Sequence, residues 1–203
     1  MDKILPVYKP CGFSTYDLIR IYKRNYKGKI GHAGTLDPFA HGVVLILLGE
    51  ATKRFDEIKK WEKTYVAGIK LGSTSTTLDP EGTIKNISSK EASKAEIQNV
   101  LNSFIGRTKQ KIPMFSAAKH KGLPLYKRAL KGEKIEKSKN IEIRDINLLS
   151  YRYPFLTIRV FCSGGTYVRQ LAQDIGNDLK TGAYLYSLER ESVGKFNEVE
   201  RIV

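Results

Sequence analysis

Hydrophobic and polar residues alternate along some stretches of this chain and recur every three or four positions along others. Alternating or continuously apolar stretches predict strands at 4–8, 43–48, 64–71, 141–151 and 155–162. Helical spacing of apolar residues predicts helices from Ser14 or Thr15 to about Tyr26, and at 94–104, 125–130 and 166–179. A short helix is also expected from Glu50, and 72–82 is expected to be a turn-rich connection.

The order of these elements predicts an α+β fold. The helix at 166–179, closed by Gly182, is expected to bury one apolar face made by Val168, Leu171, Ala172, Ile175 and Leu179. The strands at 141–151 and 155–162 are expected to pair through the turn between them. A length of 203 residues suits one large domain or two small ones, and no internal repeat or low-complexity linker is visible.

The charge of the chain suggests a kind of partner. Lys and Arg outnumber Asp and Glu by 35 to 21, which gives a net charge of +14 and a pI near 9.7. This excess favours a polyanion such as nucleic acid, although lysines on solvated helix faces would produce it too. The Lys-rich segment 127–139 is either an RNA-contacting insertion or an ordinary solvated stretch.

The composition argues against several other kinds of protein. Cys11 and Cys162 make no disulfide framework, no signal peptide is recognisable and the apolar runs are too short to cross a bilayer. A reduced, cytoplasmic protein is therefore expected. Three scattered histidines without a paired-ligand motif predict no metal site, and no cofactor is expected. Residues 163–166 lack the Gly-Lys-Ser/Thr ending of a phosphate cradle and are interpreted as a strand-to-helix turn.

One carboxylate, Asp37, stands in a loop directly before the apolar run 43–48. It is flanked by residues that control the backbone, namely Gly31, Gly34, Pro38 and Gly42. These residues favour a single orientation of the Asp37 side chain, and a loop on a rigid scaffold is a common place for catalysis. Turn chemistry alone favours a plainer interpretation, an Asp-Pro turn whose side chain bonds its own backbone.

The segment 31–53, GHAGTLDPFAHGVVLILLGEATK, resembles the active-site motif of the TruB family, the bacterial tRNA pseudouridine synthases. Other blocks that resemble this family follow in the same order, at 9–14, 63–65, 112–126, 163–169 and 188–196. The resemblance covers essentially the whole chain. It implies a single catalytic domain over 1–203 with the pseudouridine synthase fold, a mixed and mostly antiparallel sheet flanked by helices around a central active-site cleft.

The resemblance also implies an activity, the isomerisation of the T-loop uridine of tRNA, at position 55, to pseudouridine. Asp37 matches the family's essential aspartate, which acts as a nucleophile on the base or the sugar, or as a base at the ribose. Arg169 matches its partner, and Tyr65 is grouped with these two as catalytic. Burial would raise the pKa of Asp37, and a nearby cation would lower it again by about 1–3 units.

Further matched residues are expected around a uracil that has flipped out of the RNA loop. Tyr65 and Tyr167 match positions that pack on the base, although a tyrosine on a strand is more often a core residue. Leu188 matches an apolar contact to the uracil, and His32 the residue that enters the RNA loop where the base leaves. Two basic residues, Lys9 and Lys119, are expected to bind phosphate or to support loops.

The chain departs from the family pattern in two places. The family usually has Thr-Asp-Thr after its second strand, whereas Thr76 stands here in place of the acid and the first carboxylate follows only at Asp79. A carboxylate that commonly supports the site is therefore absent at position 76, which leaves the supporting contacts open but not the assignment of Asp37. The chain also stops at Val203, where most members continue into a PUA-type RNA-binding domain, and weaker or less selective tRNA binding is expected.

The expected partner is the T-arm and elbow of tRNA, bound by a monomer that needs no membrane and no protein partner. Two alternatives stay open: a related synthase that acts on another RNA, and a non-catalytic tRNA-folding module. Activity on bare tRNA would distinguish the expected enzyme from the first alternative. The complete set of Asp37, Tyr65 and Arg169 argues against the second.

Overall fold

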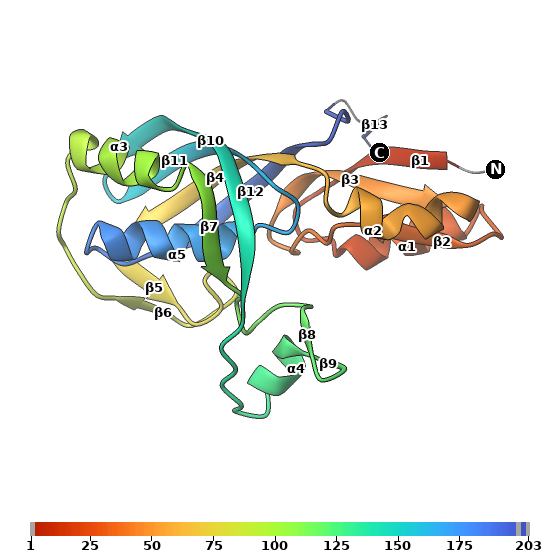
Figure 1. The fold of residues 1–203 in the computed structure, drawn as a ribbon, viewed down its shortest axis with the longest axis horizontal. Coiled ribbons are helices and arrows are strands. Elements are labelled where there is room, and N and C mark those ends of the chain that lie inside the picture. The colour runs from red at the N-terminus through yellow and green to blue at the C-terminus, as the bar shows by residue number, and fades with distance from the viewer. Residues whose placement is uncertain (1–2, 198–199, 202–203) are drawn as a thin grey trace.

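A computed structural model describes residues 3–197 and 200–201, so both ends of the domain expected over 1–203 lie outside the described residues. The described residues form a nine-stranded sheet with the order β13-β1-β3-β12-β4-β11-β10-β7, and β2 pairs with β3 at one side (Figure 1). The strands are β1 (Lys3–Lys9), β2 (Ile30–Ala33), β3 (His41–Leu48), β4 (Lys63–Leu71), β7 (Gly106–Lys111), β10 (Ser138–Arg152), β11 (Phe155–Cys162), β12 (Ala183–Val193) and β13 (Glu200–Arg201).

The sheet is mixed and mostly antiparallel. Only the pairs β1–β13 and β3–β12 are parallel among the described strands. This confirms the expected α+β fold and the pairing of the strands around 152–154, which are β10 and β11. The central strand, β12, was not predicted: it lies between β3 and β4 and joins the two halves of the sheet.

The described residues form five α-helices: α1 (Thr15–Lys23), α2 (Phe55–Ile58), α3 (Lys94–Ser103), α4 (Leu125–Ala129) and α5 (Val168–Asp178). The short helix expected from Glu50 is a 3-10 helix, η1 (Gly49–Arg54), followed by α2. Helix α1 begins at a capping box in which Ser14 and Asp17 satisfy each other's backbone amides. Helix α1 ends at Lys23, earlier than the expected Tyr26.

Helix α5 carries the apolar face expected for 166–179 and packs against the half of the sheet that contains β4, β11 and β10 (Figure 1). It approaches β12 closely, because a Cβ on Gly176 would lie 2.4 Å from Cβ of Ala183. The helix begins later than expected because Tyr167 is its extended N-cap residue, with φ −93° and ψ 101°. Residues 163–166 form the strand-to-helix turn that the sequence predicted.

The structure contains two short hairpins that were not predicted from the sequence. The region 72–82, expected as a turn-rich connection, contains β5 (Ser73–Ser75), which pairs with β6 (Ile84–Asn86). A second hairpin of β8 (Lys119–His120) and β9 (Leu123–Pro124) leads into α4, and together they project from the body of the protein (Figure 1). Strands this short carry too few residues for an alternating pattern to be recognised.

Candidate active site

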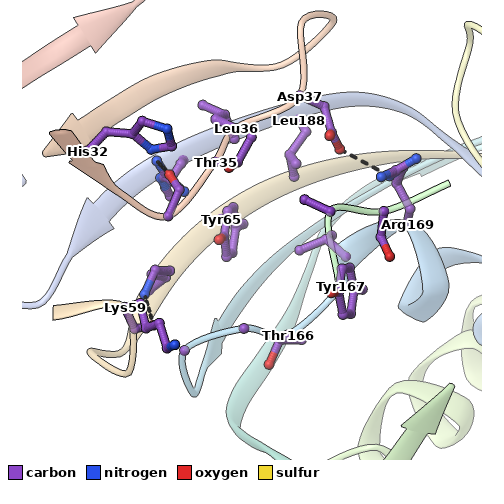
Figure 2. Close-up of a pocket in the computed structure, with 18 of the residues that line it drawn as sticks. His32, Thr35, Leu36, Asp37, Lys59, Tyr65, Thr166, Tyr167, Arg169 and Leu188 are labelled. Atoms are coloured by element: carbon purple, nitrogen blue, oxygen red, sulfur yellow. Dashed lines mark hydrogen bonds and ion pairs between the residues drawn. The ribbon is translucent and has the colours of Figure 1, made fainter. Parts of the chain in front are cut away.

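A cavity of about 970 Å³ opens where the loop after β2, the strands β4 and β12, and the turn before α5 meet. Figure 2 shows six of the expected site residues around it. The structure therefore brings together His32, Asp37, Tyr65, Tyr167, Arg169 and Leu188, which lie far apart in the sequence.

The loop that carries Asp37 is held by hydrogen bonds on both sides of this residue. The Thr15 hydroxyl bonds both the backbone N–H and the C=O of Leu36, at 3.0 and 3.1 Å. On the other side, the carbonyl of Pro38 accepts from the backbone N–H of Gly12 at 2.8 Å and from Lys9 Nζ at 3.3 Å. Such double anchoring restricts the backbone, so the Asp37 carboxylate has a defined direction toward the cavity.

Asp37 forms an ion pair with Arg169 and does not serve as the cap of its own turn. Arg169 Nε lies 3.0 Å from Asp37 Oδ2, and about a third of the Asp37 side chain stays accessible from the cavity (Figure 2). Burial raises the pKa of the Asp37 carboxyl, and the attraction of Arg169 offsets this only in part. The site thus presents a carboxylate that is partly shielded from water and incompletely neutralised.

Arg169 is fixed by three further contacts. Its Nη1 lies 2.8 Å from Asp79 Oδ2 and donates to the carbonyl of Thr77 at 3.1 Å, while Nη2 donates to the carbonyl of Phe115 at 2.9 Å. Asp79 is almost fully buried and is itself held by the Thr77 hydroxyl and by the backbone N–H of Glu81. Each of the three nitrogens of the Arg169 guanidinium therefore has a hydrogen-bond or ion-pair partner.

The site has a supporting carboxylate although position 76 carries none. Thr76 is exposed, whereas Asp79 occupies the supporting position beside Arg169. Leu78 has a φ of +67°, so the chain reverses at this point and brings the next residue into the site. Spacing along the sequence could not reveal this, because it depends on the conformation of a single turn residue.

Two residues from adjacent strands form the wall between the Asp37 loop and the turn before α5. Tyr65 on β4 and Leu188 on β12 are both about 5 % exposed at the cavity surface. Burial raises the pKa of the Tyr65 phenol, and the guanidinium of Arg190 offsets this only in part, so the phenol is neutral. An aromatic ring beside an aliphatic side chain is suited to contact the face of a planar base.

Tyr167 and His32 complete the expected cavity lining. The backbone of Tyr167 is clamped by the buried side chain of Gln110, which accepts from its N–H at 2.9 Å and donates to its C=O at 3.1 Å. His32 lies on β2, and its Nδ1 is buried without a hydrogen-bond partner among the described residues. Burial lowers the pKa of His32, and the nearby Arg190 lowers it further, so the imidazole is neutral.

The two lysines expected at the site do not line the cavity. Lys9 is fully buried, and its Nζ donates to the carbonyls of Pro10, Phe13 and Pro38 at 2.6–3.3 Å. Of the two roles expected for Lys9, this geometry fits loop support. Lys119 is exposed on the projecting β8–β9 hairpin, outside the cavity.

Sequence reasoning missed two buried cations that line the cavity, Lys63 and Arg190, of which Arg190 is the more completely buried. Its side chain is 1 % exposed and donates from Nε to the carbonyl of Val43 at 2.6 Å and from Nη2 to that of Gly34 at 3.0 Å. The available signal was its place two residues after Leu188, on the same face of a strand. That strand was hard to recognise because register shifts after Leu185 and Arg190 interrupt its alternation.

Neither a metal centre nor a membrane span is found in the described parts of the chain. No group of three or more His, Cys, Asp or Glu residues there could hold a metal ion. Within 3–197 and 200–201, no helix is long and apolar enough to cross a bilayer.

Comparison with known proteins identifies relatives over nearly the whole chain. The sequence model of the family described as "TruB family pseudouridylate synthase (N terminal domain)" matches residues 20–168. The chain is 45 % identical to tRNA pseudouridine synthase B of Clostridium acetobutylicum, over 97 % of this chain and 69 % of the relative. It is 42 % identical to tRNA pseudouridine synthase B of Parabacteroides distasonis, over 95 % of this chain and 86 % of the relative.

Solved structures share the fold. A chain of a Cbf5-Nop10-Gar1 complex matches with a TM-score of 0.75 at 24 % identity, over 98 % of this chain. A chain of an H/ACA RNP bound to a substrate RNA containing 2′-deoxyuridine matches with a TM-score of 0.72 at 23 % identity, also over 98 %. The present chain spans about half the length of each, 52 % and 50 %. Together with the sequence relatives, these findings show that the chain belongs to the TruB family of pseudouridylate synthases.

Proposed function

We infer that the protein is a tRNA pseudouridine synthase, an isomerase that converts the T-loop uridine of tRNA to pseudouridine. The family and the tRNA pseudouridine synthase B relatives support this reaction and this substrate. The observation that carries the residue roles is the Asp37–Arg169 pair, with 3.0 Å between Nε and Oδ2, at a cavity walled by Tyr65 and Leu188.

The reaction requires a carboxylate that reacts in a site shielded from water. The C–N glycosidic bond of uridine breaks, a bond from the ribose to carbon 5 of uracil forms, the proton on carbon 5 is released and N1 of the uracil takes up a proton. Asp37 supplies the carboxylate, as a nucleophile or as a base at the ribose. Arg169 favours the ionised form of Asp37 and fixes the direction of its carboxylate. The guanidinium can do this because Asp79 and a backbone carbonyl already hold it in place.

The uridine must leave the RNA stack before Asp37 can reach it, which costs a few kcal/mol. Tyr65 and Leu188 lie where they would contact one face of the extruded uracil, and Tyr167 borders the same space. The neutral His32 is suited to enter the RNA loop, because an uncharged ring can stack without requiring a counter-ion.

The proposal includes the setting in which the enzyme acts. A monomer that binds the T-arm and elbow of tRNA in the cytoplasm needs no protein partner for this reaction. Size-exclusion chromatography with light scattering on the purified chain, together with an assay on bare tRNA, tests both statements. A stable oligomer, or activity that appears only after a cell extract is added, would contradict them.

The decisive experiment compares the wild type with Asp37→Asn on tRNA that carries tritium at carbon 5 of uracil. We expect tritium release by the wild type from the T-loop uridine, and no release by the variant, which should still bind tRNA. Release at another RNA position would favour a related synthase with a different target. Tight tRNA binding by the wild type without release would favour the folding-module alternative and would contradict the proposed reaction.

A further inference from the structure

The cavity has a second charged region besides the Asp37–Arg169 pair. Five cationic residues line it, and this group is called the basic wall: Lys59, Lys60, Lys63, Lys139 and Arg190. Among the described lining residues Asp37 is the only carboxylate, and in the view of Figure 2 Tyr65 lies between Asp37 and Lys59. The cavity is thus divided into a part that holds the catalytic carboxylate and a part with an excess of positive charge.

One member of the basic wall, Lys63, is buried without an ion pair among the described residues. Lys63 is 3 % exposed, and its Nζ donates to the carbonyls of Lys59 and Trp61 at 3.2 and 2.5 Å. Arg190 is also buried, but besides two backbone carbonyls it contacts the Tyr65 hydroxyl and lies near enough to Asp37 to lower the pKa of that carboxyl. Arg169, by comparison, has two carboxylates. Burying a cation is unfavourable unless an opposite charge is near, so the charge of Lys63 is incompletely compensated.

The members of the basic wall also influence one another. Burial lowers the pKa of Lys63 to about 8, and the charges of Arg190 and Lys139 contribute to this shift. Burial lowers the pKa of Lys139 as well, with a contribution from Lys59. The geometry agrees, because a Cβ on Gly34 would lie 3.5 Å from Arg190 Nη1 and 3.6 Å from Lys63 Cε, so these two cations border the same space.

The glycine turn before α5 is part of the same region. A Cβ on Gly165 would lie 2.2 Å from Lys139 Nζ, and a Cβ on Gly164 would lie 2.3 Å from the carbonyl oxygen of Lys59. The sequence does not look like a phosphate cradle because no lysine follows the glycines. In the fold, the lysines come from other segments, Lys139 from β10 and Lys63 from the start of β4.

We propose that the basic wall binds one backbone phosphodiester of the RNA, adjacent to the uridine that enters the cavity. This inference rests on the proposed function, since an RNA nucleotide carries the base that Tyr65 and Leu188 would contact together with a phosphate next to its ribose. A phosphodiester is small enough to approach the glycine turn and supplies the negative charge that Lys63 and Lys139 lack among the described residues.

The test compares a charge change on the protein with a charge change on the RNA. An RNA stem-loop that contains the target uridine is made with a single neutral methylphosphonate linkage on either its 5′ or its 3′ side. Its equilibrium binding to the wild type and to Lys139→Gln is measured by fluorescence anisotropy. Lys139 is chosen because it is half-buried and makes no ion pair among the described residues. Lys85→Gln, at an exposed position on β6 outside the cavity, is the matched control.

We expect Lys139→Gln to weaken binding about tenfold and to reduce the slope of log K against log salt by about 1. One of the two methylphosphonates should weaken wild-type binding similarly, and should cause no further loss in Lys139→Gln. Lys139→Arg should restore both the affinity and the sensitivity to the methylphosphonate, while Lys85→Gln should retain the wild-type sensitivity.

Two results would overturn the proposal: additive losses at both linkages, or unchanged affinity in Lys139→Gln. Because binding and tritium release are separate measurements, these results differ from a failure of the proposed function. A wild type that releases tritium from the T-loop uridine but shows additive losses would retain the function and exclude the phosphate site. Non-additive losses without tritium release would support the phosphate site and contradict the function.

Discussion

Arg169 Nε lies 3.0 Å from Asp37 Oδ2, yet burial keeps the pKa of the Asp37 carboxyl above its ordinary value of 3.8. The ion pair does not neutralise the carboxylate fully because Asp79, on the other edge of the same guanidinium, shares the positive charge and also raises the pKa of Asp37. Asp37 therefore keeps more reactivity than a carboxylate in an isolated pair with arginine.

The rate of the chemical step should depend on the ionisation of Asp37. The ionised form is the active one and its pKa is raised, so the rate should begin to fall at a higher pH than an ordinary aspartate would cause. Single-turnover rates between pH 4 and pH 8 measure this. A rate that stays constant down to the ordinary aspartate value of 3.8 would contradict it, provided that circular dichroism shows a folded protein throughout.

Arg169→Lys should slow the chemical step by about 100-fold or more, with a much smaller effect on tRNA binding. A lysine ammonium is a single point of charge and cannot contact Asp37, Asp79 and the two backbone carbonyls at once. Single-turnover kinetics at saturating enzyme separate the two effects. A loss that appears only in the dissociation constant would mean that Arg169 binds RNA and does not position Asp37.

Asp79→Asn should lower the free energy of unfolding by about 1–3 kcal/mol and also slow the chemical step. The variant keeps the shape of the side chain but removes the charge from a buried contact with Arg169, and the Thr77 hydroxyl loses a charged acceptor. Urea denaturation and single-turnover rates measure the two effects.

Thr76→Ala is the matched control for Asp79→Asn, because Thr76 is exposed and its hydroxyl only accepts from the backbone N–H of Thr83. It should change stability by no more than about 0.5 kcal/mol and leave the rate unchanged. Equal effects of the two substitutions would mean that the whole turn matters and that the carboxylate of Asp79 has no special role.

Gly42→Ala should destabilise the protein by about 2–3 kcal/mol or more. Gly42 has a φ of +114°, and a Cβ there would lie 2.3 Å from the carbonyl oxygen of Arg190, where β3 and β12 pair. Gly31→Ala in the same motif should change stability by less than about 1 kcal/mol, because its Cβ would meet only Thr52 Cγ2 at 3.8 Å. Thermal melts of both variants give the comparison, and similar losses would contradict it.

Much of the fold could be predicted because long elements carry regular patterns. The strands expected at 4–8, 43–48, 64–71 and 155–162 are present within one or two residues, as is the helix at 94–104. Strand β12 was not predicted because two register shifts interrupt its alternation of buried and exposed residues. The expectation that Gly31 needs a special backbone also fails, since it lies in β2 without the positive φ of Gly34 and Gly42.

Only the site residues that lie in recognisable motifs could be predicted from the sequence. The motif residues at 32, 37, 65, 167, 169 and 188 meet around one cavity, although their individual roles stay predictions. Asp79 and Arg190 could not be assigned from spacing. The first depends on the chain reversal at Leu78, and the second on a strand that inserts between two others. The sequence could not distinguish the two roles expected for Lys9, phosphate binding and loop support. The distinction depends on the carbonyl oxygens that surround its Nζ in the fold.

The position of β12 has a consequence for the synthesis of the protein. Strands β3 and β4 do not pair with each other in the described sheet, and β12, whose last residue is 193, joins them. A growing chain on the ribosome can form β1 with β3, or β4 with β11, before β12 has emerged. It cannot yet hold Asp37 opposite Tyr65. Partly synthesised chains should therefore be inert toward tRNA, and catalysis should begin only when the strand at 183–193 has left the exit tunnel and joined the two halves.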